Sequence, residues 1–150
     1  MSGKSEWEKW RRSMRQTPRT RSGKEKRLTA AFQRDLAPLR GEVWWIGFDP
    51  SIGSELTKVR PAVVLSVASV GILPLRIVVP VTEWDAKWEA VPWMVLLKRH
   101  SRNGLSKDSA ADCFQVKSLS LRRFRSRLGV VTADEIEEIA AGVALCVGAP

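Results

Sequence analysis

The stretch Arg40–Pro61, RGEVWWIGFDPSIGSELTKVRP, decides the fold. Residues 43–48 carry large apolar side chains at both odd and even positions, which predicts a strand buried on its two faces. Asp49-Pro50 ends the pairing, because proline has no amide hydrogen to donate. A polar loop follows, and a second apolar run begins after Pro61. A charged loop between two buried strands predicts an exposed functional site on a rigid frame.

The positive charge is concentrated near the N-terminus. The first 40 of the 150 residues hold 12 lysines and arginines against 4 acidic residues, whereas residues 41–150 hold 13 against 12. Residues 98–127 are also basic, with nine cationic side chains and two acidic ones. A basic arm and a basic stripe favour nucleic acid over a membrane surface as partner. On charge alone, simple solvation of these side chains explains the pattern equally well.

The same change of composition predicts the domain organisation. Residues 1–39 are expected to form a basic N-terminal arm, partly helical or disordered, and residues 40–150 a single folded domain. One interpretation of the arm is a tail whose tryptophans dock elsewhere. The other is a segment that binds RNA or DNA phosphates while Trp7 and Trp10 stack on bases. The first is favoured, since nothing in the arm fixes a geometry.

Residue types argue against several classes of site. The chain has two cysteines, Cys113 and Cys146, without metal-ligand spacing, and a single histidine, His100. Apart from ligation by carboxylates alone, this argues against a metal site, and it also argues against a serine–histidine–aspartate triad. We therefore expect neither metal nor cofactor. No apolar run is long enough to span a membrane and no signal sequence is visible, so a cytoplasmic protein with reduced thiols is expected.

Beyond the loop the pattern predicts short strands followed by one helix. Thr132 and Glu135 have capping-box spacing at the start of that helix, and Gly148 ends it. Pro80 falls inside a β-forming run, where proline is tolerated only at an edge or a bulge. Together these signals predict a mostly antiparallel barrel or sandwich with a packed helix. Strands are expected at 62–67, 75–82, 93–97 and 109–116, a turn at 69–71, and a basic, irregular segment at 118–127.

Few residues are candidates for chemistry. Arg60 ends the first loop, Thr82 ends a strand, and Asp108 and Ser109 start another. An arginine fork binds phosphate through two hydrogen bonds, a threonine hydroxyl donates a third, and RNA supplies its own nucleophile in the 2′-hydroxyl. These residues therefore suit phosphodiester chemistry. An arginine beside a proline is nonetheless more often a surface residue, and a strand-terminal threonine more often reflects β-propensity.

Several motifs resemble the MazF/PemK family of toxin endoribonucleases from toxin–antitoxin pairs. They are RGEVWW, the DP before the loop, GSE, K-x-RP, VVPVT at residues 78–82 and GLSKDSAADCFQVKSL at residues 104–119. The likeness covers about residues 40–147. It implies a homodimer of SH3-like or CcdB/Kid-type antiparallel barrels. It also implies an antitoxin whose acidic, flexible tail blocks the RNA groove, and DNA binding by the toxin–antitoxin complex.

The resemblance implies a reaction and assigns residues to it. Single-stranded messenger RNA would be cut selectively and without metal, by attack of the 2′-hydroxyl on the adjacent phosphate, leaving 2′,3′-cyclic phosphate and 5′-hydroxyl ends. Arg60 would transfer protons and stabilise charge, and Thr82 would hold the phosphate. Glu55 would anchor the first loop by pairing with Lys58 or Arg60. The residues expected to bind RNA or shape the site are Ser54, Glu55, Lys58, Asp108, Ser109, Gln115 and Lys117.

The sequence departs from the family pattern at two places. Phe114 stands where many members have an acidic residue, and the nearest acid, Asp112, would share its strand face. Lys117-Ser118 replaces an Arg-Thr pair, which keeps the charge but loses the guanidinium fork. The alternative function is a CcdB-like toxin that binds DNA gyrase without nuclease activity. A nucleic-acid-binding regulator dominated by the arm is a further alternative. The presence of both Arg60 and Thr82 favours the enzyme, because neither alternative requires that pair.

Overall fold

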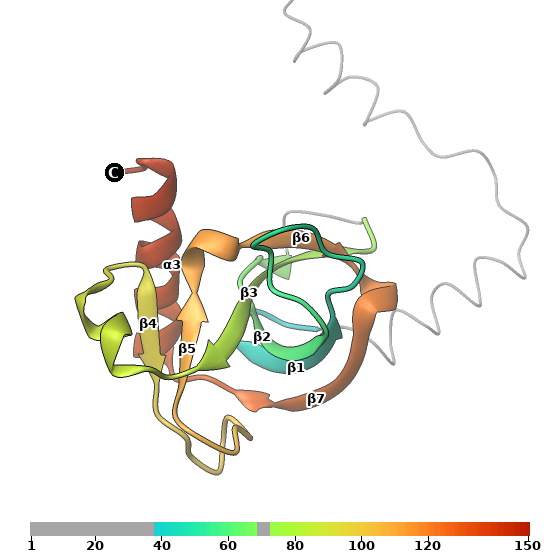
Figure 1. Ribbon diagram of the computed structural model, residues 1–150. Coiled ribbons are helices and arrows are strands. Elements are labelled where there is room, and N and C mark those ends of the chain that lie inside the picture. The colour runs from blue at the N-terminus through green and yellow to red at the C-terminus, as the bar shows by residue number, and fades with distance from the viewer. Residues whose placement is uncertain (1–37, 69–72) are drawn as a thin grey trace, which may run out of the picture. The chain divides into compact units, whose positions relative to one another are not determined.

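The computed structural model describes residues 38–68 and 73–150, which form a curved antiparallel sheet packed on one C-terminal helix (Figure 1). Residues 1–37 of the predicted arm, and the predicted turn at 69–71, lie outside the described residues. No helix in the described part of the chain is long and apolar enough to cross a membrane. The seven strands are β1 (Glu42–Gly47), β2 (Val59–Val64), β3 (Leu75–Glu83), β4 (Met94–Leu97), β5 (Ser109–Asp112), β6 (Lys117–Ser120) and β7 (Phe124–Val130).

The sheet has the order β4-β5-β3-β2-β1-β7, and β6 pairs with β3 off this path. Strand β3 therefore changes partner along its length: residues 75–78 pair with β6, and residues 81–83 pair with β5. Pro80 lies in the gap between these two ladders and is fully buried. Strand β3 is therefore central and not an edge strand. Pro80 is tolerated because β3 has no neighbouring strand on that side at this position, as at an edge.

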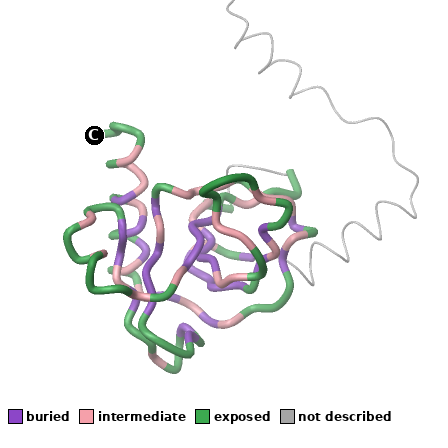
Figure 2. Tube along the Cα trace, in the orientation of Figure 1, coloured by how far each residue is buried: buried purple, intermediate pink, exposed green. Residues whose placement is uncertain are grey.

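Buried residues follow the strands and the inner side of the helix, while many loop residues are exposed (Figure 2). They form two hydrophobic cores on opposite faces of the sheet, and β1 contributes to both. Val43 belongs to the core beneath the helix, whereas Trp44 and Ile46 belong to the other core, with Leu121 and Phe124. This confirms a strand with apolar side chains buried on both faces. Trp45 is the exception, since it remains 37% exposed.

Helix α3 (Ala133–Val147) begins and ends as the sequence predicts. The Thr132 hydroxyl accepts a hydrogen bond from the Glu135 N–H at 3.1 Å, and the Glu135 carboxylate accepts one from the Thr132 N–H at 2.9 Å. Gly148 ends the helix in the left-handed conformation with φ 66°. The buried residues Ile136, Ile139 and Gly142 face the sheet.

The segment 118–127 is regular, so the predicted irregular segment is wrong. Strand β6, the short 3-10 turn η4 (Leu121–Arg123) and β7 occupy it, and β7 pairs with β1. Leu121 and Phe124 are buried among these arginines and anchor the segment to the core. The predicted strand at 109–116 also ends early, at Asp112, and the 3-10 turn η3 (Cys113–Gln115) follows it. A further 3-10 turn, η2 (Ala86–Ala90), precedes β4.

Candidate functional site

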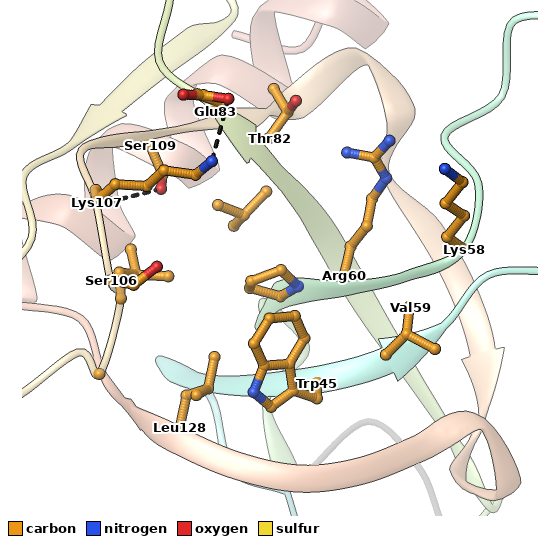
Figure 3. Close-up of a pocket in the computed structure, with 14 residues that line it drawn as sticks. Trp45, Lys58, Val59, Arg60, Thr82, Glu83, Ser106, Lys107, Ser109 and Leu128 are labelled. Carbon is orange, nitrogen blue, oxygen red and sulfur yellow. Dashed lines mark hydrogen bonds and ion pairs between the residues drawn. The ribbon is translucent and has the colours of Figure 1, made fainter.

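A pocket of about 400 Å³ opens where β2 and β3 separate. The ladder between them covers only residues 62–64 of β2, paired with residues 78–80 of β3. Past that point the two strands diverge, and side chains from the start of β2 and the end of β3 face a shared space (Figure 3). Its lining residues are Trp45, Lys58, Val59, Arg60, Pro61, Val81, Thr82, Glu83, Gly104, Leu105, Ser106, Lys107, Ser109 and Leu128.

Arg60 and Thr82, the two predicted catalytic residues, both line this pocket. The Arg60 Nε–H donates to the carbonyl oxygen of Thr57 at 2.7 Å, which leaves the terminal nitrogens of the guanidinium for a ligand. Thr82 lies opposite Ala110 in the ladder between β3 and β5, so its position is fixed by that ladder. Both residues are half-buried, and in Figure 3 the Arg60 side chain extends toward the end of β3.

The opposite rim of the pocket carries a salt bridge. Lys107 Nζ lies 3.1 Å from Glu83 Oε2, with both side chains mostly exposed, so this pair adds little to stability. The Ser109 hydroxyl donates to the Lys107 carbonyl at 2.9 Å, and Ser109 itself is buried. Lys58 stands beside Arg60 at the mouth of the pocket, with φ 68°. Three cationic side chains and a single carboxylate therefore surround the opening.

Trp45 forms an apolar wall of the pocket, although the sequence pattern predicted it to be buried. It lies opposite Pro61 in the ladder between β1 and β2, with Leu128 of β7 nearby in the lining. The indole is exposed because β3 no longer covers this end of β2. Two features of the sequence could have marked Trp45 as a site residue. They are the adjacent Trp44 and the position of Trp45 on the strand that precedes Arg60.

The loop between β1 and β2, residues 48–58, is held in place by Gln115 and Lys117. The Gln115 side chain accepts a hydrogen bond from the Leu56 N–H at 2.7 Å and donates one to the Ser54 carbonyl at 3.1 Å. Lys117 Nζ lies 2.9 Å from Glu55 Oε2. The hydrogen bond from Lys117, with its charge, lowers the pKa of the Glu55 carboxyl. Glu55 thus anchors the loop as predicted, but the predicted partners Lys58 and Arg60 are wrong.

The structure separates the predicted site residues into two groups. Lys58 and Ser109 line the pocket with Arg60 and Thr82. The others lie outside the lining: Asp108 accepts a hydrogen bond from the Arg99 N–H at 2.9 Å, and Ser54, Glu55, Gln115 and Lys117 belong to the bracing of the loop. Within residues 38–68 and 73–150, no three histidine, cysteine, aspartate or glutamate side chains gather as a metal site would require.

The family model for the PemK-like, MazF-like toxins of type II toxin–antitoxin systems matches residues 39–147. The chain belongs to this toxin family. It is 36% identical to the endoribonuclease MazF9 of Mycobacterium tuberculosis over 106 residues, covering 67% of this chain and 87% of the relative. It is 34% identical to the endoribonuclease toxin MazF of Escherichia coli over 113 residues, covering 74% and 95%.

Solved structures of family members have the same fold. MazF from Deinococcus radiodurans aligns with a TM-score of 0.63 and 30% identity, over 74% of this chain and 96% of that one. MazF in a MazE–MazF structure from the same organism aligns with a TM-score of 0.59 and 27% identity, over 75% and 97%. The mostly β fold with one C-terminal helix is therefore that of the MazF toxins, although no pairing among the described strands joins β4 to β7 and closes a barrel.

Asp112 does not share a strand face with Phe114 in this toxin, because η3 begins directly after Asp112. Its carboxylate accepts a hydrogen bond from the Phe114 N–H at 3.2 Å. Burial raises the pKa of the Asp112 carboxyl. Asp112 lies outside the lining of the pocket, and Phe114 is 66% exposed beside Trp93, with ring centroids 5.9 Å apart.

Proposed function

We propose that this protein is the endoribonuclease of a toxin–antitoxin pair and that it cleaves single-stranded messenger RNA at the pocket between β2 and β3. The observation that carries the proposal is that Arg60 and Thr82, from separate strands, line one open pocket. Two relatives more than 30% identical are named endoribonucleases, which supports the same activity. The gyrase-binding alternative does not call for a guanidinium and a hydroxyl at a shared opening.

In the proposed reaction the ribose O2′ attacks the adjacent phosphorus. The P–O2′ bond forms, the P–O5′ bond breaks, and the proton that leaves O2′ is balanced by one gained at O5′. The products are a 2′,3′-cyclic phosphate and a 5′-hydroxyl end. Negative charge develops on the non-bridging oxygens, where the terminal N–H groups of Arg60 and the Thr82 hydroxyl stabilise it. Arg60 also assists the proton transfer from O2′ to O5′.

The remainder of the pocket suits the nucleotide beside the scissile phosphate. Trp45, Pro61 and Leu128 give it an apolar wall, and the exposed indole of Trp45 presents a flat surface for base stacking. Glu83 and Lys107 at the rim offer an acceptor and a donor to the edges of a base. Sequence selectivity is therefore expected to depend on this rim, while Arg60 and Thr82 hold a group that is common to every nucleotide.

The positive rim also suits an antitoxin. Lys58, Arg60 and Lys107 surround the opening against the single carboxylate of Glu83, so an acidic, flexible tail would compete with RNA for the same charge. The MazE–MazF structures of Deinococcus radiodurans support an antitoxin partner. We propose in addition that the toxin is a homodimer and that it acts in the cytoplasm, where its messenger RNA substrate is found.

The test is cleavage of a mixed pool of unstructured RNA by the purified full chain in EDTA, with sequencing of both new ends. We expect cuts at a preferred sequence, cyclic phosphate on the upstream fragment and a 5′-hydroxyl on the downstream one. The Arg60→Ala variant serves as the matched control for contaminating nucleases. Cleavage that requires added divalent metal would contradict the proposed mechanism. Intact RNA combined with inhibition of DNA gyrase would favour the alternative function.

A further inference from the structure

The position of Arg60 depends on the loop that precedes it. The guanidinium is anchored through its Nε–H, which donates to the Thr57 carbonyl at 2.7 Å. Thr57 belongs to the loop at 48–58, most of which is exposed. A displacement of the Thr57 carbonyl would therefore rotate the guanidinium away from the space that it shares with Thr82.

Gln115 makes two of the contacts that fix this part of the loop, where the Ser51 hydroxyl also donates to the Leu56 carbonyl at 3.0 Å. Its side-chain oxygen accepts from the Leu56 N–H at 2.7 Å, directly before Thr57, and its side-chain nitrogen donates to the Ser54 carbonyl at 3.1 Å. The Gln115 amide supplies both an acceptor and a donor, whereas an ionised glutamate only accepts and leucine does neither. The nearby Lys117–Glu55 pair is partly exposed, so it contributes less to holding the loop.

We propose that Gln115 is a positioning residue for the cleavage reaction, holding Arg60 in its productive orientation through Leu56 and Thr57. This inference rests on the proposed role of Arg60. Gln115 lies outside the pocket lining, so its effect is indirect: it keeps the catalytic guanidinium aimed at the phosphate rather than touching RNA. The turn η3 after β5 places Gln115 against a loop some 60 residues earlier in the chain.

The first test compares the cleavage kinetics of Gln115→Leu with those of the full-length wild type. A misplacement of about 1 Å costs about 100-fold in rate, so kcat is expected to fall by about that factor while KM stays within about twofold. Gln115→Glu, which keeps the shape and the acceptor but loses the donor, should lie between the two. Ser118→Ala on β6 is exposed and lies outside the pocket lining, and it should leave kcat unchanged. An unchanged kcat in Gln115→Leu, or a loss confined to KM, would overturn the proposal.

A second measurement separates positioning from a general structural role. In an Arg60→Lys background the Nε–Thr57 contact is gone, so adding Gln115→Leu should lower kcat by less than about twofold, and full additivity would refute the relay. Solvent exchange of the Arg60 Nε–H, followed by NMR, provides a readout without RNA. It should accelerate in Gln115→Leu and stay slow in Ser118→Ala. If the wild type cleaves no RNA, the proposed function fails, yet the exchange rates still decide whether Gln115 holds Arg60.

Discussion

Replacing Arg60 by alanine should reduce kcat far more than it reduces the stability of the fold. The Nε–H of Arg60 is occupied by the Thr57 carbonyl, so the two terminal nitrogens remain for the phosphate. Removing preorganised donors of this kind costs about 2.7–4 kcal/mol in the transition state, which corresponds to about 10²–10³-fold in kcat. In the folded state the substitution removes one hydrogen bond, worth about 1 kcal/mol. The Arg60→Ala protein should therefore remain folded and almost inactive.

Thr82→Val provides the comparison within the same pocket. Valine keeps the shape and the strand preference but removes one hydroxyl hydrogen bond to a charged oxygen, worth about 1.5–3 kcal/mol, so a smaller loss than in Arg60→Ala is expected. The assay is single-turnover cleavage of an unstructured RNA at saturating protein, with circular dichroism to confirm the fold. Because both residues hold one phosphate, the double variant should lose less than the two single losses combined. An Arg60→Ala protein that is folded and cleaves within tenfold of the wild type would refute this reasoning.

The remaining predictions concern three other residues of the domain, Trp45, Gly142 and Cys113. Trp45→Ala should raise KM for RNA, because it removes about 1–3 kcal/mol of base stacking, while Trp45→Phe should retain most of that stacking energy. An equal loss of affinity in both variants, measured by titration with RNA, would exclude stacking. Gly142→Ala should destabilise the fold in urea unfolding by about 1–3 kcal/mol, because its added Cβ would lie 2.6 Å from Cys113 Sγ; stabilisation, as helix propensity alone would give, would contradict this. Burial raises the pKa of Cys113 to about 12, so its thiol should resist iodoacetamide at pH 8, as read by mass spectrometry. In the unfolded chain the thiol ionises near pH 9.0, so the contribution of Cys113 to the free energy of unfolding should decline as the pH rises from 9 toward 12. If the urea midpoints of the wild type and of Cys113→Ala shift equally across that range, the prediction is wrong.

The sequence was sufficient for the features that depend on local pattern. The run of apolar side chains at residues 43–48 predicted β1, and the spacing of Thr132 and Glu135 predicted the start of α3. The pairing of Arg60 with Thr82 in one pocket followed from the family resemblance, since each residue separately looked like an ordinary part of a strand. The wrong prediction for residues 118–127 has a physical cause: the buried Leu121 and Phe124 are three positions apart, in η4 and at the start of β7, so they show no strand alternation among the arginines around them.

Contacts between distant segments were beyond the sequence. Glu55 has cations three and five residues away, at Lys58 and Arg60, yet its partner is Lys117, 62 positions later. Local spacing favoured the wrong partners because the direction of the loop is set by η3, which replaces the end of a predicted strand. Trp45 was wrongly predicted to be buried for a related reason. The sequence pattern identifies a strand and its two faces, but it does not reveal where a neighbouring strand ends.

The pairing of β1 with β7 has a consequence for how a cell makes this protein. Among the strands of the described residues, β1 is the first to be synthesised, but one of its two neighbours, β7, is the last. Gln115, too, is translated well after the residues whose loop it braces. A ribosome must therefore deliver the chain as far as β7 before the pocket is complete, so a nascent chain that already carries Arg60 and Thr82 still lacks Leu128, another residue of the pocket lining.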